Sequence, residues 1–307
     1  MPTPAAETME DSNATFGLDR AALRAAFDRA SASYEASATL QARVGRELLS
    51  RLEPFGFHPD VVLDLGCGTG WLSGELKQRY RRASVLALDV APGMLREAAR
   101  HQRLFRHFAR ICGDAMRLPL ADSSVDLVFS SLMLQWCEPL DEALGEVRRI
   151  LKPGGFFCFS TLGPDTLAEL RAAWSTVDEF SHVNRFIDMH DVGEALMRAG
   201  LGEPVLDVER VQLGYRDVIA LMRELKSIGA HNVTHGRPRG LTARSRLAKL
   251  QAAYEPLRRE GTLPATYEVV YGVAWGTEAR PAAPDEVLIS PSAIGRRGRT
   301  RGAGRTE

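Results

Sequence analysis

The sequence has no long hydrophobic run and no excess of charge of either sign. None of its stretches approaches the ~18 consecutive apolar residues that a membrane-spanning helix needs. Residues 1–16 show no charged segment followed by an apolar one, as a secretory signal does. The 39 basic residues balance the 39 acidic residues, so no overall field attracts nucleic acid. We therefore expect a protein that binds neither a membrane nor nucleic acid.

Cysteine is scarce, and its spacing does not indicate metal binding. The four cysteines are Cys67, Cys112, Cys137 and Cys158, and they form neither a C-x-x-C pair nor a pattern with histidine. Structural zinc sites usually show such a pattern. We expect free thiols in a reducing cytoplasm, and no metal ion.

The two ends of the chain differ in composition from the rest. Residues 1–16 read as a flexible arm. Residues 277–307 are rich in Pro, Gly, Ser and Arg and read as a disordered tail, because they hold too few apolar residues to bury a core. Residues 17–276 are expected to form one domain. Within 17–54, apolar residues recur every three or four positions, which predicts one or two amphipathic helices.

Residues 55–163 alternate between short apolar runs and helical patterns. The expected strands are 61–66, 84–90, 108–115, 124–134 and 156–162, and the expected helices are 70–80, 91–102 and 139–155. Such alternation indicates right-handed βαβ units and a parallel sheet. The remaining expected elements are two closing strands, 204–215 and 265–276, and two substrate-side helical regions, 164–200 and 216–262. The sequence thus predicts a Rossmann-like α/β fold with seven mostly parallel strands.

The segment "DLGCGTG" places glycines at 66, 68 and 70, directly after the first expected strand. Ligands of parallel sheets bind beyond the carboxyl ends of the strands, and glycines there let a ligand lie against the backbone. The dinucleotide fingerprint G-x-G-x-x-G is not matched, because Trp71 stands where its third glycine would be. Asp64, two residues before the first glycine, repels a phosphate and suits a cationic group.

Two further acids lie at the ends of the second and third expected strands. Asp89 lies 19 residues after Gly70, where an acid accepts hydrogen bonds from ribose hydroxyls. Asp114 is placed to bind an adenine amino group. A nucleoside with a cationic amino-acid arm and no phosphate fits these acids, and S-adenosylmethionine has that chemistry.

Four segments resemble the successive motifs of the class I S-adenosylmethionine-dependent methyltransferases, over about residues 55–165. They are "VLDLGCGTG", "ALDVAPGML", "GDAMRLPLADSSVDLVFSSLMLQW" and "EVRRILKPGGFFCFSTLG". The resemblance implies S-adenosylmethionine as the cofactor and a helical lid, residues 17–54, folded over it. The cofactor-binding residues that it implies are Asp64, Gly66, Cys67, Gly68, Gly70, Asp89, Val90, Met94, Asp114, Ala115 and Leu132.

The flanking segments resemble a narrower family, the malonyl-acyl-carrier-protein O-methyltransferases of early biotin synthesis, over about residues 20–276. The more telling pieces are "LQW" and "TYEVVYG", which the core methyltransferase motifs do not require. This resemblance implies methyl transfer to the carboxylate of a malonyl thioester, carried by an acyl-carrier protein or coenzyme A. The carrier is acidic, and the basic stretch 237–246 is the preferred candidate for meeting it.

A malonyl carboxylate is ionised at neutral pH, since its pKa is near ~4, and needs no general base. The site must align the reactants, exclude water and hold the carboxylate, for which arginine is best suited. The candidate catalytic residues are Arg171, Arg185, Gln135, Trp136 and Tyr34. A surface ion pair is the alternative for either arginine, and an apolar packing position for Tyr34 or Trp136. His182 and His190 are expected at the surface or in helix caps.

Three other interpretations stay open. The chain could be a methyltransferase for another small acceptor, such as a dicarboxylate or a quinone. It could be a non-catalytic assembly factor that keeps the cofactor site. It could also be an NAD-dependent oxidoreductase, although Trp71 and the glycine spacing argue against this.

Overall fold

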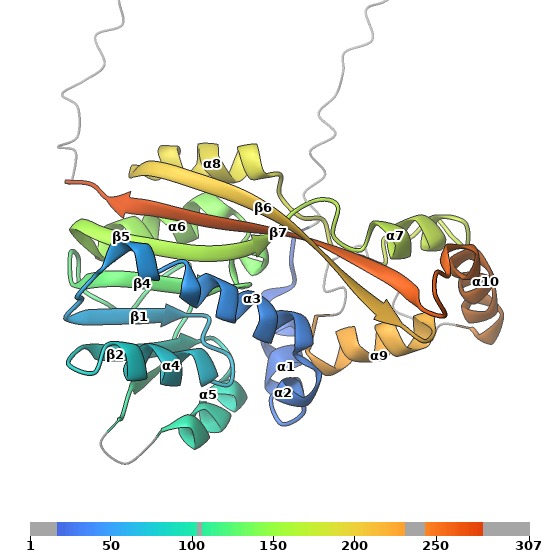
Figure 1. The fold of residues 1–307 in the computed structure, drawn as a ribbon, viewed down its shortest axis with the longest axis horizontal. Coiled ribbons are helices and arrows are strands. Elements are labelled where there is room, and N and C mark those ends of the chain that lie inside the picture. The colour runs from blue at the N-terminus through green and yellow to red at the C-terminus, as the bar shows by residue number, and fades with distance from the viewer. Residues whose placement is uncertain (1–16, 103–105, 231–242, 279–307) are drawn as a thin grey trace, which may run out of the picture.

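The computed structural model describes residues 17–102, 106–230 and 243–278 (Figure 1). The expected flexible arm, nearly all of the expected tail and most of the 237–246 stretch lie outside these described residues.

A single seven-stranded sheet forms the centre of the molecule, in the order β3-β2-β1-β4-β5-β7-β6. The strands are β1 (Val61–Leu65), β2 (Ser84–Asp89), β3 (Ala109–Cys112), β4 (Val125–Ser131), β5 (Leu151–Leu162), β6 (Leu201–Tyr215) and β7 (Leu263–Gly276). The first five strands run parallel, β7 is antiparallel to β5, and β6 is antiparallel to β7. The predicted Rossmann-like, mostly parallel sheet is therefore confirmed.

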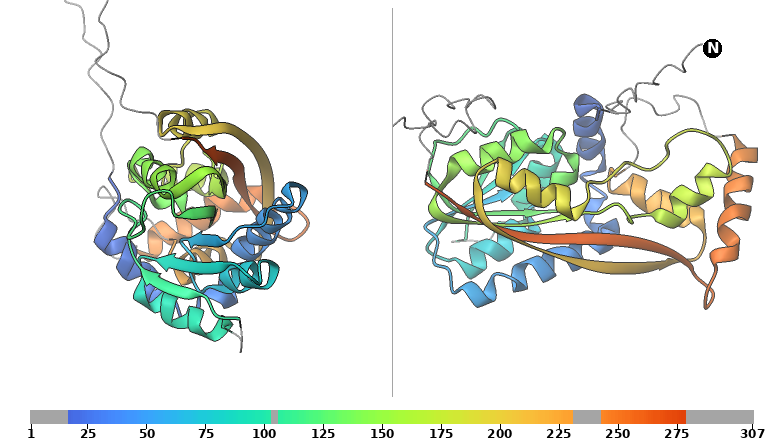
Figure 2. Two further views of the ribbon diagram at one scale, coloured as in Figure 1. Left: turned by 90° about the vertical axis from the view of Figure 1, so that its left-hand side faces the viewer. Right: turned by 90° about the horizontal axis from the view of Figure 1, so that it is seen from above.

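Helices cover both faces of this sheet, which explains the continuous apolar runs of its strands. The covering helices are α3 (Thr39–Ser50), α4 (Trp71–Arg79), α5 (Pro92–Ala98), α6 (Leu140–Ile150) and α8 (Met189–Arg198). In β1, Val62 belongs to a core cluster with residues of α3 and α4, whereas Leu63 and Leu65 belong to a second cluster with residues of α6 and α8, and all three side chains are fully buried. The two views of Figure 2 show these helices on either side of the twisted strands.

The long hairpin of β6 and β7 extends past the other strands and carries a second group of helices (Figure 1). These helices are α7 (Ala168–Ser175), α9 (Val218–Ser227) and α10 (Arg244–Tyr254). The short N-terminal helices α1 (Arg20–Ala30) and α2 (Tyr34–Ser37) lie between this group and the carboxyl ends of β1 and β2. The fold thus surrounds the carboxyl edge of the sheet with helices from three distant parts of the chain.

Two expected boundaries were wrong. The helix predicted over 139–155 ends at Ile150, because Leu151 already pairs with Val125 as the start of β5. The register between β4 and β5 shifts after that pair, and the resulting bulge takes up Pro153, which cannot sit in a helix interior. In the region 164–200, residues 176–188 between α7 and α8 form no helix.

Candidate active site

The turn after β1 is held by the neighbouring strand. The backbone N–H groups of Gly66 and Cys67 both donate to the carbonyl oxygen of Leu88, at 2.9 Å each. Gly68 follows with φ +53°, and a Cβ atom added there would meet no atom within 4 Å. The space above Gly68 is therefore open, and a ligand can lie directly on the backbone.

Asp89 sits at the end of β2 and is tied to the same turn. One carboxylate oxygen accepts from Gly68 N at 2.9 Å, and the other accepts from Ala91 N at 2.8 Å. Burial raises the pKa of Asp89 to about 6, although these backbone hydrogen bonds oppose the shift. Asp89 is thus a buried acid with its orientation fixed.

Asp64 lies deeper, with 1% of its surface exposed, and accepts a hydrogen bond from Ser73 Oγ at 2.5 Å. Burial is the main cause that raises its pKa to about 7, and the nearby charge of Asp89 adds to the shift. Two acids whose ionisation costs free energy therefore lie next to one turn. A bound cation would stabilise the ionised form of both carboxyls.

A cavity of about 290 Å³ opens at this edge of the sheet. It collects most of the predicted site residues, namely Gly66, Gly68, Asp89, Val90, Met94, Asp114, Ala115, Leu132, Tyr34, Gln135 and Trp136. Asp64, Cys67 and Gly70 are buried and do not line it. Gly70 is needed there for packing, because a Cβ atom on it would lie 2.6 Å from the Cβ of Ala98.

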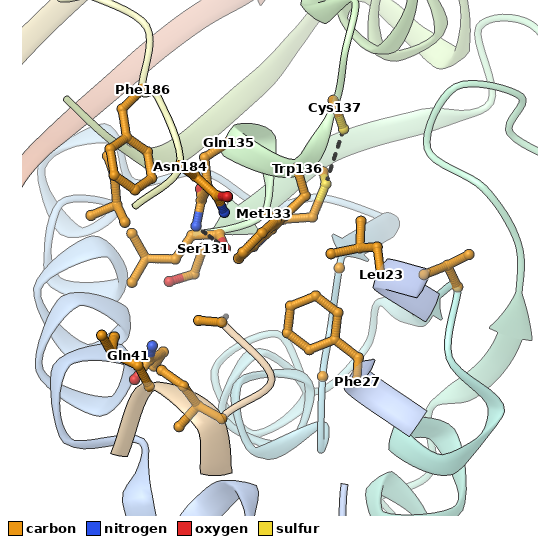
Figure 3. A pocket seen from close by; sticks show the side chains of 18 of the residues that line it. Leu23, Phe27, Gln41, Ser131, Met133, Gln135, Trp136, Cys137, Asn184 and Phe186 are labelled. Carbon is orange, nitrogen blue, oxygen red and sulfur yellow. Dashed lines mark hydrogen bonds between the residues drawn. The ribbon is translucent and has the colours of Figure 1, made fainter. Parts of the chain in front are cut away.

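The N-terminal helices close one side of this cavity. The Phe27 ring meets the edge of Trp136 with 5.4 Å between ring centroids (Figure 3). Asp28 accepts a hydrogen bond from Gly93 N at the start of α5, and Arg20 pairs with Asp114 at 3.6 Å. These contacts hold α1 across the ends of β2 and β3.

Tyr34, from the same segment, lies close to the acid at the end of β2. Burial is the main cause that raises the pKa of the Tyr34 phenol, and the charge of Asp89 contributes to the rise. The phenol therefore keeps its proton at neutral pH and remains a hydrogen-bond donor inside the cavity.

The two predicted carboxylate-binding arginines are not brought into this cavity. Arg171 donates through Nη2 to the carbonyl oxygens of Pro164 at 2.9 Å and Thr166 at 2.6 Å, so it fixes the loop before α7. Arg185 lies beside a separate cavity of about 20 Å³. Within the described part of the chain, Arg20 is the one arginine that lines the main cavity.

Sequence reasoning missed the wall opposite the glycine turn. His182 does not lie at the surface as expected, because its ring stacks on Trp174 at 3.6 Å between centroids and lines the cavity. Its Nε2 lies 2.7 Å from Asp178 Oδ1. Further side chains on this wall are Thr166, Leu170, Asn184, Phe186, Met222, Leu225 and Tyr267. His190, in contrast, is an exposed partner of Asp188 at the start of α8.

Two side-chain amides in the cavity have unpaired oxygens. Gln41 Oε1 and Asn184 Oδ1 are buried and have no hydrogen-bond partner among the residues described. In Figure 3, Asn184 lies next to Gln135, and Gln41 lies across the open space from both. Buried amides are nearly always hydrogen-bonded, so these two are prepared for contact with a ligand.

Other kinds of site find no support in the described ranges. No group of three or more histidine, cysteine, aspartate or glutamate side chains there is arranged to hold a metal ion. Nor does any helix in those ranges have the length and apolar character to cross a membrane. All four cysteines are free; Cys67, Cys137 and Cys158 are buried, whereas Cys112 is exposed.

Comparisons with known proteins agree with this geometry. Residues 63–159 match the methyltransferase domain family. The malonyl-[acyl-carrier protein] O-methyltransferase of Methylovorus sp. (strain MP688) is 54% identical over 274 residues, which cover 87% of this chain and 93% of that protein. Its counterpart in Laribacter hongkongensis is 51% identical, over 87% of this chain and 92% of that protein. The crystal structure of the YcgJ protein of Bacillus subtilis shares the fold, with a TM-score of 0.56 and 15% identity over 76% of this chain and 99% of its own.

Proposed function

This chain belongs to the malonyl-[acyl-carrier protein] O-methyltransferase family, and we propose that it transfers a methyl group from S-adenosylmethionine to a malonyl carboxylate on acyl-carrier protein. The product is a malonyl methyl ester, which the resemblance assigns to early biotin synthesis. The observation that carries the proposal is the identity of about half of all residues over nearly the whole length of two relatives with that name.

The residues around the glycine turn fit S-adenosylmethionine. The bare backbone of Gly68 offers room for the methionine arm, and the buried acids Asp64 and Asp89 favour its cationic centres. Asp89 has both carboxylate oxygens at the cavity edge for ribose hydroxyls. Asp114 Oδ1 accepts from Met116 N at 2.9 Å, and Asp114 lines the cavity together with Met94, which supports a contact with the adenine.

When bound, S-adenosylmethionine supplies an electrophilic methyl group on a positively charged sulfur. The chain's own task is then to align an ionised acceptor with that methyl group and to exclude water from both. Phe27 and Trp136 supply an apolar wall, while Leu132 and Gln135 follow β4 at the junction of the two reactants. A malonyl carboxylate needs no proton removed, so the site requires no general base.

The test is methyl transfer from labelled S-adenosylmethionine to three purified acceptors: malonyl-carrier, acetyl-carrier and malonyl-coenzyme A. We expect a base-labile methyl ester on the malonyl thioesters and none on the acetyl-carrier. Equal labelling of the acetyl-carrier, or no ester on either malonyl thioester, would remove this acceptor assignment. In that case the dicarboxylate and quinone acceptors should be tested with the same enzyme.

We further propose that the enzyme works in the cytoplasm without binding a membrane or nucleic acid. The free cysteines and the balanced charge support this, since neither a disulfide framework nor a strong overall field is present in the chain. Fractionation of cells followed by detection of the protein would test it, and recovery in a membrane pellet would contradict it.

A further inference from the structure

We propose that Asn184 binds the acceptor carboxylate through its side-chain amide, an inference that rests on the proposed function. Asn184 is 9% exposed, and its Oδ1 atom has no hydrogen-bond partner in the described chain. It lines the main cavity, where Figure 3 shows its amide beside Gln135. Rotation about the last side-chain bond exchanges oxygen and nitrogen, so the amide can present its N–H groups to a carboxylate.

The position of Asn184 places it at the acceptor end. The other unpaired amide, Gln41, is one helical turn before Gly45, which packs against Trp71 at the start of α4 and thus near the cofactor turn. Asn184 instead belongs to the segment between α7 and α8, next to the stacked pair of Trp174 and His182. Figure 3 accordingly shows the two amides on opposite sides of the open space.

The segment that carries Asn184 is fixed before any ligand binds. Asp178 Oδ1 accepts from Phe180 N at 3.1 Å and lies 2.7 Å from His182 Nε2, and Arg246 pairs with the same carboxylate at 3.5 Å. Ser181 Oγ donates to the carbonyl oxygen of Val183 at 3.0 Å. A ligand contact held in this way needs little reorganisation on binding.

A neutral amide suits the reaction better than an arginine. The carboxylate loses its negative charge as the methyl group is transferred, so a guanidinium would stabilise the reactant more than the transition state. An amide donor orients the carboxylate with a weaker hold on its charge. This explains why Arg171 and Arg185 can serve elsewhere while an amide lines the cavity.

The experiment compares Asn184→Ala with the isosteric Asn184→Asp. Loss of one hydrogen bond to a charged group should raise KM for malonyl-carrier roughly 10- to 100-fold in the alanine variant. The aspartate variant should be worse still, because it places a like charge against the carboxylate. Gln212→Glu makes the same amide-to-acid change at an exposed position of β6 and is the matched control, with KM expected to stay unchanged.

Two further readouts separate this role from a structural one. In both variants the affinity for S-adenosylhomocysteine should stay within about twofold of the wild type. The melting temperature should stay within about two degrees of the wild type. Inhibition by acetyl-carrier, which lacks the carboxylate, should also be unchanged.

The inference is overturned if the aspartate variant is no worse than the alanine variant, since Asn184 would then accept a hydrogen bond from the ligand. It is equally overturned if acetyl-carrier inhibition or cofactor affinity weakens to the same extent as the malonyl KM rises. A wild-type enzyme that methylates no malonyl thioester removes the proposed function and this inference together. A wild-type enzyme that does so, with normal Asn184 variants, removes only the inference.

Discussion

Gly68 and Gly70 stand in one turn and both have positive φ, yet alanine should act differently at each. At Gly68 an added Cβ meets no atom within 4 Å and points into the open cavity, so in the free protein only the left-handed backbone is penalised. That penalty is ~1 kcal/mol, which lowers the melting temperature by roughly 2–4 °C in a domain of this size. The methyl group would occupy the space of the bound cofactor, and a steric penalty of about 1.4–2.8 kcal/mol weakens binding roughly 10- to 100-fold.

At Gly70 the Cβ would lie 2.6 Å from the Cβ of Ala98 and 3.0 Å from its Cα. Carbon atoms pack at ~3.5–4 Å, so α4 and α5 would have to separate. Overpacking and backbone strain together cost about 2–4 kcal/mol. Gly70→Ala should therefore melt roughly 10 °C lower, while its folded fraction binds S-adenosylhomocysteine within about threefold of the wild type.

Calorimetric titration with S-adenosylhomocysteine and thermal melting of both variants provide the assay. Wild-type affinity in Gly68→Ala would show that the cofactor does not lie on this backbone. A wild-type melting temperature in Gly70→Ala would show that the approach of α4 to α5 is not as tight as the structure has it.

Three further outcomes are expected. In the proposed site, ribose hydroxyls donate to the ionised Asp89, whose pKa is raised to about 6. Affinity for S-adenosylhomocysteine should therefore be about tenfold weaker at pH 5 than at pH 8, and Asp89→Asn should flatten this step of the calorimetric profile. The ligand-free protein should become more stable as the pH falls from 8 to 6, which thermal melting would show as a higher melting temperature. In this range Asp64 and Asp89 take up protons in the folded chain, whereas in the unfolded chain their carboxyls stay ionised until the pH falls near 3.8. Arg171→Ala should lose about 2 kcal/mol of stability in denaturant titrations while KM for the acceptor stays constant, and a raised KM with normal stability would restore its predicted role as a carboxylate clamp.

The sheet was predictable because parallel strands buried on both faces must be apolar throughout. Val61–Leu65 and the later strands therefore appear in the sequence as short apolar runs followed by polar residues. The boundary at Leu151 was not predictable, since Pro153 and the glycines after it are typical of a helix end. Only pairing with β4 makes the same residues the start of a strand.

The two ends of the candidate site also differ in how far the sequence predicts their residues. At the proposed cofactor end, Asp89 is the last residue of β2 and Asp114 lies two residues after β3, so the order of elements alone places them together. At the acceptor end, His182 and Asn184 come from an irregular segment whose position depends on packing against Trp174. Polar residues in such a segment suggest a surface loop, and nothing local in the sequence indicates that they face inward.

Backbone strain marks the place where the two ends meet. Leu132 and Leu167 are non-glycine residues with φ of +51° and +57°, and both line the cavity. Such backbone costs of order 1 kcal/mol each and persists only where other bonds enforce it. Leu132 N donates to Ser160 O at 3.0 Å, and Leu167 N donates to Thr266 O at 2.7 Å. Since β5 and β7 hold both conformations, this part of the cavity wall is set by the sheet itself, before any ligand binds.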